Sequence, residues 1–334
     1  MPTFLQQVHE KARTSPKHVV LQEGNDERSI EAASFSTAAG IARVTLIGDP
    51  TQIRQVAASK ALRMDSVEII DQSRLPELDD YAHELFEMRK HKGLSEHAAL
   101  ELIRQPLWYG AMMVHKGAVD TFVTGAVHST AEVCRVSIQV VGLKAGIRTL
   151  SSFFAMVLPK PTFGKEGVLF YGDCAVVIDP DPSQLADIAI STAESFQQLV
   201  GEAPRVALLS LSTKGSAKHP RIDKVLGALG LVKQRSPELE IDGELQLDAA
   251  LVPHVGQKKA PGSTVAGRAN VLIFPDLDAG NIGYKLTERI GGAEAIGPFL
   301  QGTAKPCCDL SRGCKSADIV NCIAVNVVRF QALS

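Results

Sequence analysis

The chain has 334 residues, of which 45% are apolar and 22% are charged, and its formal net charge at pH 7 is −2. These proportions are those of a globular protein that can bury a sizeable core, and the length favours two domains. The near-neutral charge gives no overall basic field for nucleic acid, and no apolar run approaches the ~20 residues of a membrane span.

Strand and helix patterns alternate over the first part of the chain. Strands are predicted at residues 18–22, 43–48, 67–70 and 121–125, and helices at 26–39, 81–90, 95–104, 106–116 and 130–141. Such alternation is typical of a mostly parallel sheet that carries helices on both faces.

A different pattern begins after a break near residues 142–148. Residues 149–158 and 168–178 are strand-like runs joined by a Pro/Gly-rich turn, which predicts a hairpin. A helix is predicted at 183–200, strands at 206–211 and 270–274, and a surface loop at 257–268.

The last helix, after Ser316, must pack on another element, and the N-terminal sheet is a plausible partner. The first domain would then be discontinuous. We place it at residues 1–145 with 298–334, and the second domain at residues 146–297.

Six cysteines occur without the spacing of a zinc site, which favours reduced thiols. The first ten residues lack the basic-then-apolar pattern of a signal peptide. We therefore expect a cytoplasmic protein that holds no metal and binds neither nucleic acid nor a membrane.

Several common catalytic motifs are absent from the chain. There is no G-x-G-x-x-G, no G-x-x-x-x-G-K-[ST], no H-E-x-x-H and no G-x-S-x-G. Their absence counts against nicotinamide dehydrogenases, P-loop nucleotide hydrolases, zinc peptidases and α/β-hydrolases.

The loop before the last helix carries the clearest catalytic candidates. Arg312 can bind a phosphate with two hydrogen bonds, Ser311 can donate to a developing oxyanion, and Asp318 can accept a proton. Free backbone N–H groups and the helix dipole also favour an anion there. Spacing alone, however, favours a capping role for Asp318.

A second candidate follows the predicted strand at 121–125. Ser129 and Thr130 open a helix at the carboxyl end of that strand, where an anion can bind, and Arg135 lies about one and a half turns later. A simple Ser/Thr cap with a solvated arginine explains the same residues equally well. The basic run that starts at Arg89 fits the cations favoured at a helix C-terminus.

Six stretches of the chain resemble one family. They are Tyr171–Val176, Ile241–Ala250, Asn270–Arg289, Gly302–Gly313, Glu23–Arg28 and Leu46–Asp49. On these residues the chain resembles the phosphate acetyltransferases (phosphotransacetylases) of the phosphate acetyl/butyryl transferase family, over nearly its whole length.

The resemblance implies a reversible transfer of acetyl between acetyl phosphate and coenzyme A, and thus a role in acetate metabolism. The ligands it implies are coenzyme A or acetyl-coenzyme A, acetyl phosphate and inorganic phosphate, with coenzyme A as a substrate and no cofactor. It also implies a homodimer of two α/β/α domains with mostly parallel sheets and an interdomain cleft, similar to the isocitrate/isopropylmalate dehydrogenase fold.

The resemblance assigns roles to single residues. Asp318 matches the base that deprotonates the coenzyme A thiol, Ser311 matches a residue that stabilises the transition state, and Arg312 matches one that holds the phosphoryl group. Family arginines that contact coenzyme A or acetyl phosphate match Arg89, Arg135 and Arg289. The chain departs from the family at Cys308, where an asparagine is usual.

Two mechanisms and three other functions stay open at this point. The thiolate attacks acetyl phosphate directly in a ternary complex, or Cys308 or Cys314 forms an acetyl-cysteine intermediate. The alternative functions are transfer of a longer acyl group such as butyryl, an NAD-dependent dehydrogenase of the same architecture, and a non-catalytic sensor of acyl phosphate or coenzyme A.

Overall fold

The computed structural model describes residues 3–333, which form two compact units. The first unit runs to Lys144 and resumes at Thr303, and the second spans Ala145–Gly302. The last strand of the second unit pairs with its neighbour as far as Gln301, so this unit continues past the boundary expected at residue 297. No helix within residues 3–333 is both long enough and apolar enough to span a bilayer.

The first unit is a parallel sheet with helical crossovers. Its elements are α1 (Phe4–Thr14), β1 (Lys17–Leu21), α2 (Glu27–Ala38), β2 (Ala42–Gly48), α3 (Pro50–Ser59), β3 (Val67–Asp71), α4 (Leu78–Arg89), the 3₁₀ turn η1 (Lys90–Lys92), α5 (Glu96–Ile103), α6 (Pro106–Lys116), β4 (Thr121–Thr124), α7 (Thr130–Val136), the π-helical turn η2 (Ser137–Val141), β11 (Cys307–Asp309) and α13 (Ser316–Gln331).

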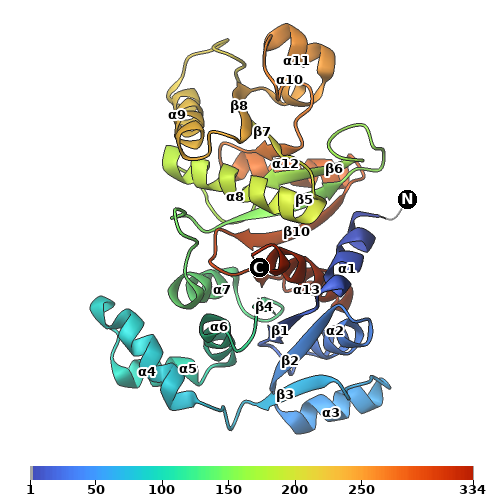
Figure 1. Ribbon diagram of the computed structural model, residues 1–334, viewed down its shortest axis with the longest axis vertical. Helices are drawn as coiled ribbons and strands as arrows, with labels where there is room; N and C mark the ends of the chain where they lie inside the picture. The colour runs from blue at the N-terminus through green and yellow to red at the C-terminus, as the bar shows by residue number, and fades with distance from the viewer. Residues whose placement is uncertain (1–2, 334) are drawn as a thin grey trace. The chain divides into compact units, whose positions relative to one another are not determined.

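The strands of this sheet lie in the order β11-β4-β1-β2-β3, and every pair is parallel. Helices α1, α2 and α13 pack together on the sheet, as Figure 1 shows, while α6 packs on it from the opposite face. Val19, Val20 and Leu21 of β1 are all buried, as expected for a strand that helices cover on both faces.

The C-terminal helix α13 is built into this first sheet. Ile323 is fully buried, and Asn326 Nδ2 donates to Thr121 Oγ1 at 2.9 Å and to the carbonyl of Phe122 at 3.0 Å. Because both acceptors belong to β4, these bonds hold the end of the chain against the centre of the N-terminal sheet.

The second unit is a mixed sheet with helices. Its elements are β5 (Ser151–Val157), β6 (Val168–Gly172), α8 (Pro182–Val200), β7 (Arg205–Leu209), α9 (Pro220–Arg235), β8 (Glu240–Leu245), α10 (Leu247–Leu251), α11 (Pro253–Lys259), β9 (Val271–Ile273), α12 (Leu277–Arg289) and β10 (Glu294–Gln301).

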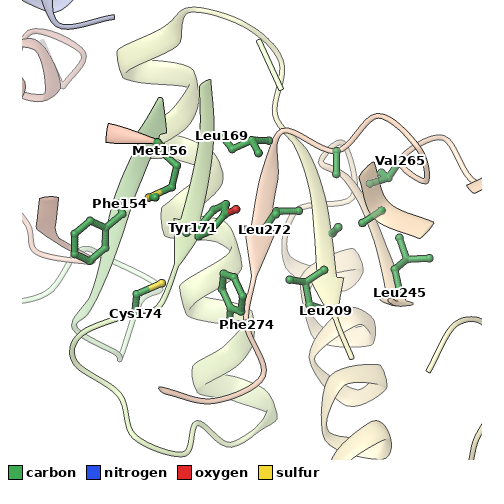
Figure 2. Close-up of a cluster of buried hydrophobic side chains, with 14 of the residues drawn as sticks. Phe154, Met156, Leu169, Tyr171, Cys174, Leu209, Leu245, Val265, Leu272 and Phe274 are labelled. Atoms are coloured by element: carbon green, nitrogen blue, oxygen red, sulfur yellow. The ribbon is translucent and has the colours of Figure 1, made fainter. Parts of the chain in front are cut away.

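The second sheet has the order β10-β5-β6-β9-β7-β8. β5 and β6 pair antiparallel, which confirms the predicted hairpin, β10 is antiparallel to β5, and the other pairs are parallel. Figure 2 shows Tyr171, Leu272 and Phe274 side by side in the core of this sheet, where the ring centroids of Tyr171 and Phe274 lie 5.2 Å apart.

One strand prediction in this unit is wrong, and one loop prediction holds for most of its length. The strand predicted at 168–178 ends at Gly172, because the buried carboxylate of Asp173 accepts the N–H groups of Ala175 and Val177 and folds the chain into a turn. Of the segment predicted as a surface loop at 257–268, residues 257–259 end α11 and residues 260–268 form a loop, in which Val265 is fully buried (Figure 2).

Candidate active site

The first sheet brings three loops to one edge. β11, β4 and β1 are adjacent and parallel, so their carboxyl ends meet, and the loops at residues 310–315, 125–129 and 22–26 follow them. The Leu310 N–H donates to the Thr124 carbonyl at 2.7 Å. The pairing of β11 with β4 therefore continues into the loop that holds the catalytic candidates.

A buried carboxylate shapes the loop after β4. The side chain of Glu23 is 4% exposed and accepts the backbone N–H groups of Ala126, Val127 and His128 at 2.8 to 2.9 Å, as well as His128 Nδ1 at 2.7 Å. Burial raises the pKa of Glu23, but the hydrogen bonds from His128 and Val127 outweigh it and hold this pKa below its ordinary value. Glu23 is therefore charged, and it holds the loop in a tight turn.

The guanidinium of Arg28 connects all three loops. Its Nε and Nη2 donate to the two carboxylate oxygens of Asp26 at 2.9 and 2.7 Å, and Nη2 also donates to the Ala126 carbonyl at 2.9 Å. Its Nη1 donates to the carbonyls of Arg312 and Cys314 at 2.9 and 3.0 Å. The paired Asp26 carboxylate raises the pKa of Arg28, which stays charged.

Ser311 and Asp318 are each held by a backbone N–H of their own loop. Ser311 Oγ accepts the Gly313 N–H at 3.3 Å, and Asp318 Oδ2 accepts the Lys315 N–H at 2.8 Å. Asp318 is the third residue of α13, so the capping role that spacing favours is present in the structure. Both side chains are also exposed and free to meet a ligand.

Arg312 lies between them with an exposed side chain. Within residues 3–333, no hydrogen bond or ion pair engages its guanidinium, although its backbone carbonyl is bound by Arg28. An exposed, uncommitted guanidinium beside a hydroxyl and a carboxylate is suited to a phosphate ligand.

The second predicted group is placed beside this loop. Ser129 caps α7 in a reciprocal pair with Glu132, because Ser129 Oγ accepts the Glu132 N–H while the Glu132 carboxylate accepts the Ser129 N–H. Thr130 is the first residue of α7, and it is exposed. Capping of α7 therefore accounts for Ser129.

Asp309 is a buried acid at the centre of this edge. It is 3% exposed, and its Oδ1 has no hydrogen-bond partner within residues 3–333. Burial raises the pKa of Asp309 to about 6, with the nearby Glu23 carboxylate adding to the shift and the Thr130 hydroxyl opposing it. Gly125 leaves room for this carboxyl, since a Cβ there would meet Asp309 Oδ1.

The three predicted ligand arginines lie in different places. Arg89 is half-buried at the C-terminus of α4, and Arg135 is exposed on α7. Arg289 belongs to the second unit, where it is the last residue of α12 and its Nε lies 3.3 Å from a carboxylate oxygen of Glu288. Within residues 3–333, no hydrogen bond or ion pair joins Arg89 or Arg135 to the loop that carries Ser311.

The cysteines near the site differ in their surroundings. Cys308 is fully buried, and burial raises the pKa of its thiol well above the ordinary value. Burial also raises the pKa of Cys307 to about 12. Cys314 is 8% exposed beside Arg28, and burial raises its pKa as well. Within residues 3–333, no group of three or more His, Cys, Asp or Glu side chains is arranged to hold a metal ion.

Sequence reasoning missed three residues of this edge as functional candidates: Glu23, Arg28 and Asp309. All three lie in stretches singled out for family likeness; Glu23 lies two residues after β1, and Asp309 ends β11. The sequence therefore contained a signal for these residues, because ligand sites form at the carboxyl ends of parallel strands. Which ends meet depends on strand order, which the sequence does not show.

Comparison with known proteins identifies the same family over almost the whole chain. Residues 3–327 match the phosphate acetyl/butaryl transferase family. A phosphate acetyltransferase of Acetivibrio thermocellus is 50% identical over 329 residues, which are 98% of each chain. The crystal structure of a phosphotransacetylase from Streptococcus pyogenes superposes with a TM-score of 0.93 at 36% identity, again over 98% of both chains.

A more distant likeness concerns the fold alone. A 4-hydroxythreonine-4-phosphate dehydrogenase from Burkholderia phymatum superposes with a TM-score of 0.57 at 13% identity, over 94% of this chain and 98% of that one. The architecture is therefore shared with dehydrogenases, as the fold prediction stated.

We predict that replacing Gly125 destabilises the first unit. Gly125 has φ +102°, and a Cβ would meet Asp309 Oδ1 and, at 2.5 Å, the Leu310 nitrogen. Gly125→Ala should lower the free energy of unfolding by about 1–3 kcal/mol beyond the cost of the positive φ itself. Urea denaturation measures this, with Gly93→Ala as the control, since Gly93 has φ +85° and open space around it. Equal losses in the two variants would contradict the prediction.

The Glu23–His128 pair predicts a dependence of stability on pH. The hydrogen bond to Glu23 raises the pKa of His128 above 6.5, so its contribution is complete below pH 6.5 and is lost as pH rises through the folded-state pKa. The pKa of Glu23 is lowered below 4.5, so its contribution is lost as pH falls through that lower value.

His128→Gln should therefore destabilise the protein most between about pH 4.5 and 6.5, and progressively less toward pH 8. Thermal unfolding of both proteins across this range measures the difference. The exposed His97 supplies the control, and His97→Gln should show no such profile. A stability difference that grows above pH 7 would refute the assignment.

Proposed function

This chain belongs to the phosphate acetyl/butaryl transferase family, and on that premise we propose that it transfers acetyl reversibly between acetyl phosphate and coenzyme A. The observation that carries the proposal is the loop between β11 and α13. It presents Ser311, the uncommitted guanidinium of Arg312 and the carboxylate of Asp318 at the carboxyl edge of a parallel sheet. Those are the groups that an acyl transfer to and from phosphate requires.

The proposed reaction begins with a proton transfer. A free thiol has a pKa of ~8.5, so the coenzyme A thiol needs a base at neutral pH. Asp318 is exposed, and among residues 3–333 its carboxylate accepts only the Lys315 N–H, so its second oxygen is open to the thiol proton. The thiolate then attacks the acetyl carbonyl carbon of acetyl phosphate, and the carbon–sulfur bond forms.

The second half of the reaction releases phosphate. The carbonyl oxygen gains negative charge in the transition state, and the bond from the carbonyl carbon to the phosphate oxygen then breaks. Ser311 donates a hydrogen bond to the developing charge, and Arg312 holds the departing phosphate. The products are acetyl-coenzyme A and inorganic phosphate, and the proton stays on Asp318 until solvent or phosphate removes it.

Direct transfer in a ternary complex is preferred over an acetyl-cysteine intermediate. Cys308 is fully buried with a pKa far above its ordinary value, so it is neither accessible nor readily ionised. Cys314 is the remaining candidate, and burial raises its pKa too. No cofactor enters this scheme, and coenzyme A acts as a substrate.

Other residues are proposed to bind the substrates. Arg89, Arg135 and Arg289 would pair with the phosphates of coenzyme A or acetyl phosphate, and Thr130 would add a hydroxyl beside the loop. We assign Ser129 to the same substrate-binding group, in which it keeps its capping hydrogen bond.

We further propose a cytoplasmic homodimer, for which sedimentation at twice the mass of one chain is the check.

Transfer of a longer acyl group, such as butyryl, is the second candidate function. The family is named for butaryl as well as acetyl transfer. The relatives at 43 to 50% identity are named phosphate acetyltransferases, which favours acetyl.

Turnover of acetyl phosphate tests the proposal directly. We expect purified protein to form acetyl-coenzyme A from acetyl phosphate and coenzyme A in the presence of EDTA, followed by thioester absorbance. Butyryl phosphate serves as the matched substrate and should give a lower kcat/KM. Absence of turnover by folded protein would reject the proposed function, and faster turnover of butyryl phosphate would reassign it. Parallel double-reciprocal lines would reject the ternary complex.

Asp318→Asn separates a catalytic base from a helix cap. An amide oxygen can still accept the Lys315 N–H but cannot take the thiol proton, so we expect kcat to fall on the order of 10²–10⁴ with KM little changed and with stability retained. Asp181→Asn is the control, since Asp181 caps α8 by a bond to the Gln184 N–H. A kcat near that of the unmodified protein would leave Asp318 as a cap only.

A further inference from the structure

Arg28 makes the most extensive contacts at this edge, yet no step of the proposed reaction uses it. Its three nitrogens donate to a carboxylate on its own loop, to the carbonyl of Ala126 after β4, and to the carbonyls of Arg312 and Cys314 after β11. The acceptors lie up to 286 residues away along the chain. One side chain therefore joins the three loops that border the candidate active site.

The two carbonyls after β11 that Arg28 binds belong to peptide groups whose N–H groups contact the candidate catalytic side chains. A peptide unit is planar and trans, so the direction of its C=O sets the direction of its N–H. The peptide that carries the Arg312 carbonyl presents the Gly313 N–H, and that N–H donates to Ser311 Oγ at 3.3 Å.

The second peptide repeats this arrangement. The unit that carries the Cys314 carbonyl presents the Lys315 N–H, which donates to Asp318 Oδ2 at 2.8 Å. Nη1 of Arg28 thus holds the two peptide groups whose opposite sides hold the hydroxyl and the carboxylate of the candidate site.

Arg28 is itself rigidly placed. Both oxygens of Asp26 accept from its guanidinium, and Asp26 also caps α2 through the Arg28 backbone N–H at 2.9 Å. The hydrogen bonds from Arg28 hold the pKa of Asp26 below its ordinary value, so the pair stays charged at neutral pH. Ala126, whose carbonyl accepts from Arg28, is held in place as well, because its N–H donates to the Glu23 carboxylate.

We propose that Arg28 is the positioning residue of this site: it orients the peptide groups 312–313 and 314–315, and through them the side chains of Ser311 and Asp318. The proposal rests on the proposed acetyl transfer. Arg28 acts through the loop and not on the substrate, so its loss displaces the catalytic groups without removing a ligand contact. Displacements of about 1 Å cost on the order of 10²-fold in rate.

Lysine cannot replace arginine in this role. The planar guanidinium supplies five N–H donors in a fixed fork, and here three of its nitrogens meet two carboxylate oxygens and three carbonyls. A lysine ammonium has three donors at a single point and cannot reach both the Asp26 carboxylate and the loop after β11. Arg28→Lys should therefore keep the charge and the fold but lose the positioning.

The test combines kinetics with hydrogen exchange on the full chain. For Arg28→Ala and Arg28→Lys we expect kcat for acetyl transfer to fall on the order of 10²-fold, with KM for coenzyme A and acetyl phosphate within about threefold of the unmodified values. The Gly313 and Lys315 amides should exchange faster, and added guanidinium ion should restore part of kcat in Arg28→Ala, because the site is partly open with the Arg28 side chain 28% exposed.

Arg13→Ala is the matched control. Arg13 is exposed in the same unit and also donates to a backbone carbonyl, that of Ala39 at 2.9 Å, but it lies outside the three loops. Its loss should change neither kcat nor the exchange of the two amides. Arg28→Ala combined with Ser311→Ala should lose less activity than the product of the two single losses, because Arg28 acts through Ser311.

Three results would overturn the proposal. They are a kcat of Arg28→Lys within twofold of the unmodified protein, a loss carried by KM alone, and a fall in kcat with unchanged exchange at Gly313 and Lys315. The second would make Arg28 a substrate-binding group, and the third would make it a group that acts directly on the reacting atoms. An unmodified protein without turnover would instead reject the proposed function, and the exchange rates would still decide whether Arg28 holds the loop.

Discussion

A charged carboxylate buried at the end of a strand is the constraint on which this site depends. Burying a charge without hydrogen-bond partners costs a large free energy, so the Glu23 carboxylate needs hydrogen-bond donors. The backbone N–H groups that follow β4 supply them. Satisfying Glu23 bends the chain after β4 into the turn that starts α7. The same turn presents the Ala126 carbonyl to Arg28, whose other donors hold the loop after β11.

The second unit uses the same device at or near the ends of two of its strands. Asp173, directly after β6, accepts the Ser152 hydroxyl and the N–H groups of Ala175 and Val177. Glu244, within β8, accepts the Ser212 hydroxyl and the Gly215 N–H. In each case a buried acid organises a turn at the edge of a sheet. In the first unit alone, that organisation extends by way of Arg28 to the exposed loop with Ser311 and Asp318.

The sequence predicted most elements that have a strong local pattern and failed where distant residues decide. The helix at 106–116 and the hairpin after residue 149 follow from periodicity and turn residues. The strand predicted to reach Ile178 was cut short by the buried Asp173, whose need for donors overrides β propensity. The loop predicted at 257–268 is present from residue 260 on, but its Val265 is buried because the neighbouring β9 and β8 supply a core that its own segment lacks.

By itself, the sequence determined the fold class, the family likeness and the loop that carries Ser311, Arg312 and Asp318, because each depends on residues close together in the chain. Only the tertiary structure decided that Glu23 and Arg28 belong to the same site. Their contacts depend on β11, β4 and β1 being neighbours, and that strand order follows from packing over the whole unit. A hydrogen bond from Arg28 to the carbonyl of Cys314 joins residues that no local pattern connects, so it exists only once the sheet has assembled.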